Sequence, residues 1–231
     1  MNTNDRPYIY PMEPEANGGL SETILGCTFR VSNSLGVGFL EITKPMESLM
    51  KTATGNRMTP QDVSWAERCQ TVKDAGFDGV EMWIGTDDFH METTDDEIKA
   101  LREGIETAGF QVSSVALTMV WDNPICGPED SVQERAIEIA ARQIAAANLF
   151  GTDAFLVVTG RHSADNDMSA ALNRIVSGFK RIGQVAADAG VKVGAKTCPR
   201  LSVNLMTPLE CTAFDEAVGN PAVGISWIPP T

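Results

Sequence analysis

The chain has 231 residues, and its 31 acidic side chains outnumber its 18 lysines and arginines, which gives a formal net charge of -13. This charge repels phosphate backbones, so we expect no unaided binding to nucleic acid. The N-terminus has no basic stretch followed by an apolar run, and no apolar stretch is long enough to span a membrane. The sequence therefore predicts a cytoplasmic protein without a membrane segment. Its five cysteines are scattered and include no Cys-x-x-Cys pair, which indicates reduced thiols.

In chain order, residues 1–20 predict a loose N-terminal arm, and residues 21–231 predict one domain. Within that domain, apolar runs predict six strands, near residues 23–30, 78–83, 111–119, 153–159, 191–197 and 222–228. The segment 32–59 is unusually long for a connection and is typical of a lid or a partly ordered loop.

A glycine precedes four of the predicted strands, in the segments KDAGFDGVEMW, ETAGFQVSSVAL, NLFGTDAFLVV and ADAGVKVGAK. Glycine favours the left-handed conformation that often ends a helix, so each segment predicts a helix that ends and a strand that follows. Helix starts are predicted at Thr59-Pro60, at the capping box Thr94–Glu97 and at Thr207-Pro208. The repeat is thus a helix alternating with a strand.

Alternating strands and helices predict parallel pairing, in a barrel or a doubly wound sheet. We find no Gly-rich phosphate loop of the common types, which favours the α/β barrel. An eight-stranded barrel needs two more βα units than the six predicted here. We therefore expect an incomplete barrel of about six βα units, truncated before strands 7 and 8. Because its open edges need pairing, we also expect a homo-oligomer.

Four pieces of the sequence occur in the order AGFDGVEMW, GIETAGFQVSSVAL, the run from DNPICGPEDSV to GTDAFLVV, and TPLECTAFDEAVGNPAVGISW. Together they resemble the xylose isomerase-like TIM barrels called sugar phosphate isomerase/epimerases, which are relatives of metal-dependent apurinic endonucleases. The resemblance implies a (β/α)8 barrel with a divalent Mn, Mg, Co or Zn ion at the C-terminal strand ends. It also implies proton transfer next to the carbonyl of a sugar or sugar phosphate. The metal ligands of the family are a Glu on strand 5, an Asp on strand 6, a His on strand 7 and a Glu on strand 8.

This chain departs from that ligand pattern. The position of the strand 5 glutamate is occupied by Lys196, and the position of the strand 6 aspartate by Ile228. A protonated lysine has no lone pair to donate and repels a cation. We therefore expect no bound metal in this chain. We interpret Lys196 instead as a residue that holds an anion or as a catalytic amine. The alternative is an ordinary surface lysine at the barrel mouth.

Glu81 matches the glutamate of the family motif GVELW, which implies a catalytic or substrate-holding carboxylate at a strand end. The alternative is a carboxylate that bonds the backbone or a lysine such as Lys192. Trp83 lies on the same face and is a candidate for substrate binding or for lining of the mouth. His90, Arg161 and His162 follow predicted strands and are further candidates for substrate binding, with a solvated loop as the alternative. Arg161 together with His162 could hold a phosphate.

Two hypotheses remain from the sequence. The first is an isomerase or epimerase in which Glu81 is the acid or base and Lys196 replaces the electrostatic role of the metal. The second is a non-catalytic or truncated relative, a pseudoenzyme that serves as a binding or assembly scaffold.

Overall fold

A computed structural model describes residues 51–117, 121–161, 167–198, 202, 205 and 207–226. Its elements are β1 (Ala53–Gly55), the 3-10 helix η1 (Asn56–Met58), α2 (Trp65–Asp74), β2 (Gly79–Trp83), α3 (Asp95–Thr107), β3 (Gln111–Ala116), α4 (Asp130–Phe150), β4 (Ala154–Val158), α5 (Met168–Ala189), β5 (Lys192–Lys196), α6 (Pro208–Val218) and β6 (Val223–Ser226). All strand pairs are parallel, and the order in the sheet is β1-β2-β3-β4-β5-β6. The α/β barrel-type architecture is confirmed. Among the described residues the sheet stays open, with β1 and β6 as its edges.

The five predicted strands from residue 78 onward are confirmed in their described parts. The predicted strand at 23–30 and the arm at 1–20 lie outside the described residues. The strand that pairs with β2 is β1, with Thr54 opposite Val80 and Gly55 opposite Glu81. The interpretation of residues 53–55 as part of a long connection is therefore wrong. A three-residue strand is too short to show an alternating pattern in the sequence.

Helix ends follow the predicted chemistry. Gly151 and Gly190 end α4 and α5 with φ angles of 77° and 70°, in the left-handed region that favours glycine. Reciprocal capping boxes start α3 at Thr94 and α6 at Thr207.

The prediction that Thr59 caps α2 is wrong. Ser64 forms a capping box with Glu67 there, whereas the Thr59 hydroxyl donates to the Asn56 carbonyl at 2.7 Å.

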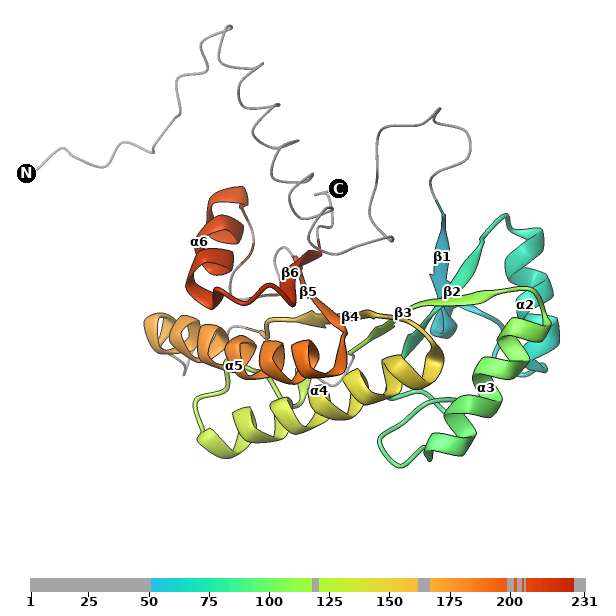
Figure 1. Cartoon of the computed structure of the whole chain (residues 1–231), viewed down its shortest axis with the longest axis horizontal. Helices are drawn as coiled ribbons and strands as arrows, with labels where there is room; N and C mark the ends of the chain where they lie inside the picture. The colour runs from blue at the N-terminus through green and yellow to red at the C-terminus, as the bar shows by residue number, and fades with distance from the viewer. Residues whose placement is uncertain are drawn as a thin grey trace, which may run out of the picture.

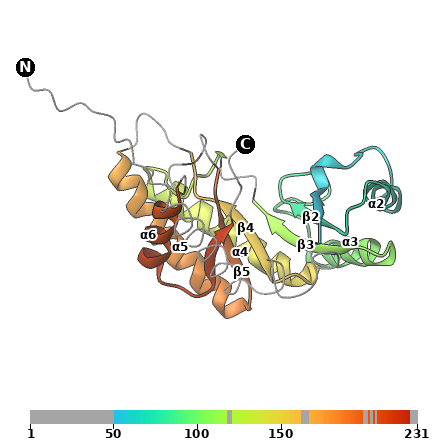
Figure 2. The ribbon, with the colours of Figure 1, turned by 90° about the horizontal axis from the view of Figure 1, so that it is seen from above.

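The helices follow one another in chain order along one side of the sheet (Figures 1 and 2). Neighbouring helices pack together from α2 to α6, and α4, α5 and α6 also pack on the strands. Edge-to-face ring pairs stabilise this layer. Phe89 meets Phe150 with centroids 5.2 Å apart, and Phe179 meets Phe214 at 5.1 Å. The core therefore lies between the sheet and its helices.

The two faces of the sheet differ in burial. Side chains that point toward the helices are fully buried, as Met82, Phe155 and Val193 show. The residues that alternate with them include Glu81, Trp83 and Lys196, which are only partly buried. This second face is the inner face of a barrel, so its polar side chains lie where a (β/α) barrel carries function.

Four cysteines fall within the described residues, and none of them forms a disulfide. Burial raises the pKa of the Cys69 and Cys126 thiols, which keeps them in their unreactive protonated form. In the described part of the chain, no helix combines the length and the hydropathy that crossing a bilayer requires.

Candidate functional site

Trp83, the last residue of β2, is the centre of a polar cluster on the inner face of the sheet. Its indole N–H donates a hydrogen bond to Oε1 of Glu81, two residues earlier in the same strand. The other carboxylate oxygen, Oε2, accepts a hydrogen bond from the Ser114 hydroxyl at 2.8 Å. An ionised carboxylate has about four acceptor sites, so two donors hold Glu81 in place and leave it able to accept from a ligand.

A β-bulge brings Ser114 into this cluster. Val80 pairs with Val112, whereas Glu81 pairs with Ser114, so Ser113 is an additional residue in β3. The extra residue shifts the register and turns the Ser114 hydroxyl toward Glu81. Without the bulge, Ser113 would pair with Glu81. Ser114 was not predictable from the sequence, because a single-residue shift inside the run Ser113-Ser114 leaves no pattern there.

Lys196, the last residue of β5, reaches Trp83 across the inner face of the sheet. Its Nζ lies 5.1 Å from the centroid of the Trp83 ring, within the range of a cation–π interaction. Lys196 pairs with Val158 of β4 and Ser226 of β6, which places it at the C-terminal strand ends. The structure thus brings together Glu81, Trp83 and Lys196, three of the residues singled out in the sequence.

Lys192 does not bond Glu81. Its Nζ donates to the Pro221 carbonyl at 3.3 Å, at the opposite end of β5. The alternative in which Lys192 neutralises Glu81 is therefore wrong, because one strand places Lys192 and Lys196 at its two ends.

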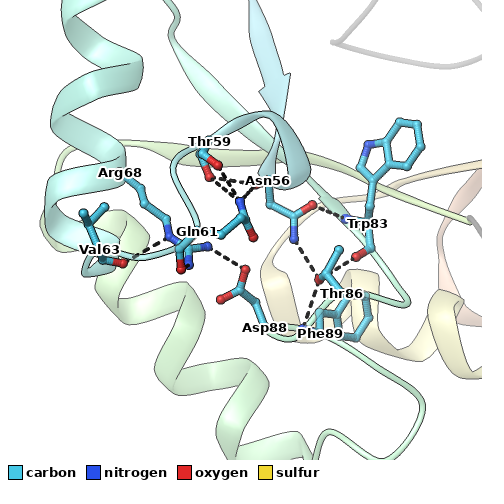
Figure 3. A network of polar contacts seen from close by, with 9 residues as sticks. All are labelled: Asn56, Thr59, Gln61, Val63, Arg68, Trp83, Thr86, Asp88 and Phe89. Atoms are coloured by element: carbon cyan, nitrogen blue, oxygen red, sulfur yellow. Dashed lines mark hydrogen bonds and ion pairs between the residues drawn. The ribbon is translucent and has the colours of Figure 1, made fainter.

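The backbone of Trp83 is held by a partly buried network that starts at η1 (Figure 3). The Asn56 side chain is fully buried; its Oδ1 accepts from the Trp83 backbone N–H at 3.0 Å, and its Nδ2 donates to Thr86 Oγ1 at 3.1 Å. The Thr86 hydroxyl in turn donates to the Trp83 carbonyl at 3.2 Å. Asn56 and Thr86 thus fix the end of β2 from both sides.

An ion pair extends this network to α2. Arg68 Nη1 lies 2.7 Å from Asp88 Oδ2, and the two side chains are only 7% and 13% exposed. Arg68 also donates to the carbonyls of Gln61 and Val63, at 2.8 Å and 3.3 Å. The loop after β2 is therefore attached to the segment that precedes α2, and both support the position of Trp83 (Figure 3).

Arg57 is the second cation on Trp83, and it was not among the residues predicted from the sequence. Its guanidinium carbon lies 5.9 Å from the centroid of the ring. Arg57 belongs to η1, inside the segment that was interpreted as a long connection. No signal in the sequence marked Arg57, because β1, the strand that precedes η1, leaves no pattern of its own.

His90 lies apart from this cluster. Its Nδ1 is 3.1 Å from Glu92 Oε2, and its side chain is about half exposed. It lines a hollow of about 410 Å³ between α2, α3 and the loop after β2, together with Trp65, Thr93 and Leu101. Glu81, Trp83 and Lys196 do not line this hollow. Substrate binding by His90 stays a prediction.

Arg161 follows β4 at the C-terminal strand ends. Its backbone forms an antiparallel bridge with Ser202, and its carbonyl accepts from the Cys126 thiol at 3.4 Å. Its side chain is exposed. His162 lies outside the described residues, and so does Ile228. Roles for Arg161 and His162 in substrate binding stay predictions.

The residues of the cluster do not fit a divalent metal. A hard cation takes oxygen or imidazole ligands, and the cluster offers one carboxylate, Glu81, beside two cationic side chains. Across the described ranges, no three His, Cys, Asp or Glu side chains gather in a way that could hold a metal ion. The expectation that this chain binds no metal rests on the charge of Lys196 and stays a prediction.

Comparison with solved structures finds the same fold in sugar epimerases. A D-psicose 3-epimerase in the presence of D-fructose is 17% identical with a TM-score of 0.63, over 76% of this chain and 62% of that chain. An L-ribulose 3-epimerase is 20% identical with a TM-score of 0.64, over 75% and 58%. A xylose isomerase-like TIM barrel protein from Mycobacterium smegmatis in complex with magnesium is 18% identical with a TM-score of 0.57, over 76% and 63%.

The chain spans about three-fifths of the length of these structures. At such low identity the likeness establishes the fold and leaves the activity open. A comparison with curated proteins finds no match. The family model of the xylose isomerase-like TIM barrels matches residues 69–229, more than half of the chain. Together with the parallel βα architecture, this match means that the chain belongs to the xylose isomerase-like TIM barrel family.

Proposed function

We propose that this protein binds a small sugar or sugar phosphate at the inner-face cluster and moves a proton next to its carbonyl group, with Glu81 as the base. The observation that carries the proposal is the arrangement on Trp83, which contacts both the Glu81 carboxylate and the Lys196 ammonium group. A base and a cation held by one rigid side chain suit a reaction that removes a proton and creates negative charge.

In the proposed step, Glu81 takes the proton from the carbon next to the sugar carbonyl. The electron pair of the broken C–H bond moves into the new C=C bond, and the carbonyl oxygen becomes negative. The positive charge of Lys196 lowers the energy of this negative oxygen through space, without a direct contact. When Glu81 gives the proton to the former carbonyl carbon, the neighbouring hydroxyl group passes its own proton to the enediolate oxygen and becomes the new carbonyl, which gives an isomer. An epimer forms when a proton from solvent reaches the first carbon on the opposite face and Glu81 releases its proton to solvent. No step requires a metal ion.

A second candidate function is a non-catalytic sugar-binding or assembly scaffold. The observation that favours it is Lys196 itself, which stands where the resemblance implies a metal-binding glutamate. A lysine there removes one ligand of the metal that the resemblance makes responsible for stabilising the enediolate. The two candidates predict the same ligand but a different fate for its C–H bonds, so one experiment separates them.

The experiment follows the exchange of sugar C–H protons with deuterium in D2O by NMR, for D-fructose, D-psicose and their 6-phosphates. We expect exchange next to the carbonyl with the wild-type protein, and a loss of about 100-fold or more in Glu81→Gln, because a general base contributes at least this factor. Glu103→Gln, which changes an exposed carboxylate on α3, is the control and should exchange like the wild type.

Calorimetry on the same sugars completes the test. Binding without exchange would support the scaffold and reject the catalytic proposal. If none of the four compounds binds or exchanges, the assignment of this cluster as a sugar site is wrong.

A further inference from the structure

Two cations on Trp83 have no carboxylate partner. Lys196 and Arg57 lie 5.1 Å and 5.9 Å from the centroid of the same ring, and neither forms an ion pair within the described part of the chain. Glu81, the nearby carboxylate, is bonded by Trp83 and Ser114 instead. The cluster therefore carries two positive charges and one negative charge.

Most described arginines of this protein, whose net charge is -13, have a carboxylate partner. Of the eight described arginines, six form ion pairs with Asp or Glu, namely Arg68, Arg102, Arg135, Arg142, Arg174 and Arg181. The other two are Arg57 and Arg161, which follow β1 and β4 at the same sheet end as Lys196. Among the six described lysines, Lys99 alone forms an ion pair, so Lys196 shares the missing partner with other lysines, whereas Arg57 and Arg161 differ from the other described arginines.

We propose that Lys196 and Arg57 form an anion-binding subsite, which holds a phosphate or carboxylate group carried by the ligand. The inference rests on the proposed function for the identity of the ligand as a sugar, and it specifies that this sugar is anionic. Two unpaired cations attract a dianion and repel a divalent metal, so the subsite replaces a metal site rather than supporting one.

The surroundings of the two cations support this inference. Arg57 follows the fully buried Asn56, whose hydrogen bonds attach η1 to β2 (Figure 3). The Arg57 backbone is thus held while its side chain stays exposed. Lys196 ends a strand that is paired on both sides. Both cations therefore have fixed attachment points, which lowers the entropic cost of holding an anion.

The first experiment measures the binding of inorganic phosphate by calorimetry and by 31P NMR, at low and at physiological salt. Loss of one charge-assisted hydrogen bond is expected to weaken binding roughly 10- to 100-fold, in Lys196→Met and in Arg57→Met alike. Lys192→Met is the matched control, since it removes the same charge from the same face of β5 at its other end, and should bind phosphate like the wild type. Added salt should weaken the binding.

The second experiment titrates Mn²⁺ and follows the free ion by its EPR signal. We expect no stoichiometric binding to the wild-type protein and an increase in affinity in Lys196→Glu, where a second carboxylate joins Glu81. Stoichiometric binding to the wild type that is lost in Glu81→Gln would overturn the anion subsite, because the cluster would then be a metal site.

A third comparison separates this inference from the proposed function. D-fructose 6-phosphate should bind at least about tenfold more tightly than D-fructose, and Lys196→Met should remove the difference. Equal binding of both sugars would reject the anion subsite while the sugar site stands. Phosphate binding that depends on Lys196, without binding of either sugar, would support the subsite and reject the proposed function.

Discussion

Asn56 and Gln143 are both fully buried amide side chains, but their surroundings differ. Asn56 uses its amide N–H and its carbonyl oxygen in hydrogen bonds to the loop and strand that hold Trp83. Among the described residues, neither amide atom of Gln143 has a partner. A buried polar group stabilises the fold only when it is paired, so the same chemical group has opposite effects at the two positions.

We expect Asn56→Ala to lower the free energy of unfolding by about 2 kcal/mol or more, because the Trp83 backbone N–H is left buried without its partner. Urea unfolding at neutral pH measures the change. The control is Asn148→Ala, which removes one hydrogen bond from an exposed side chain to the Ala189 carbonyl at 3.0 Å and should cost less than about 0.5 kcal/mol. Equal effects of the two substitutions would mean that the network at Asn56 is not a stabilising element.

Gln143→Met should stabilise the protein, by about 1 to 2 kcal/mol, because it replaces an unpaired amide by an apolar group of similar volume. The chain offers a matched control on the same helix. Gln133 is also buried, but its Nε2 donates to the carbonyls of Ile125 and Arg174, at 3.2 Å and 2.7 Å. Gln133→Met should therefore destabilise. A lower melting temperature for Gln143→Met would contradict this account.

At the scale of the elements, the capping boxes link the helices to pH. Hydrogen bonds from the backbone and side chain of Thr94 hold the pKa of the Glu97 carboxyl below its ordinary range. The Ser64 hydroxyl and backbone do the same for Glu67 at the start of α2. A pKa that is lower in the folded than in the unfolded state stabilises the fold above the unfolded pKa. This stabilisation is lost as the pH falls through the folded value.

Glu97→Gln should therefore be less stable than the wild type at neutral pH, and the difference should shrink as the pH falls through the lowered pKa of the folded Glu97 carboxyl. Urea unfolding at a series of pH values measures it. Glu103→Gln, on the exposed side of the same helix, serves as the comparison, because it removes a carboxylate that takes no part in the capping box at Thr94. If the stability difference for Glu97→Gln is constant with pH, the capping box makes no pH-dependent contribution.

The helices and the later strands were predictable from the sequence because their signals are local. A glycine such as Gly190 and a capping pair such as Thr94 and Glu97 act within one helical turn. β1 was not predictable in this way. Its three residues form a strand because β2 lies beside them, and tertiary pairing of this kind leaves no periodic pattern in the sequence.

The site divides in the same way. The motif GVEMW predicted that Glu81 and Trp83 lie at a strand end, and the strand boundary at Lys196 was predicted as well. Arg57 and Ser114 join them through β1 pairing and through a one-residue bulge, both of which depend on neighbouring strands. The residues that contact the motif from other strands were therefore the part of this cluster that could not be predicted. One of them, Arg57, adds a positive charge to it.

For the whole molecule, the open sheet and the net charge have opposite effects on association. β1 and β6 each have one unpaired edge among the described residues, which favours pairing with a second copy. The charge of -13 opposes contact between copies. At physiological ionic strength the Debye length is about 8 Å, so the repulsion is screened while backbone hydrogen bonds across an edge are not.

We therefore expect self-association that increases with salt, which light scattering coupled to size-exclusion chromatography measures at low and at physiological ionic strength. Ala53→Lys places a charge at an exposed position of the edge strand β1 and should shift the protein toward the monomer. Ala145→Lys adds the same charge at an exposed position of α4 and controls for net charge. A monodisperse monomer under both salt conditions would show that the strand edges are covered within one chain, whereas association that Ala53→Lys leaves unchanged would place the contact away from β1.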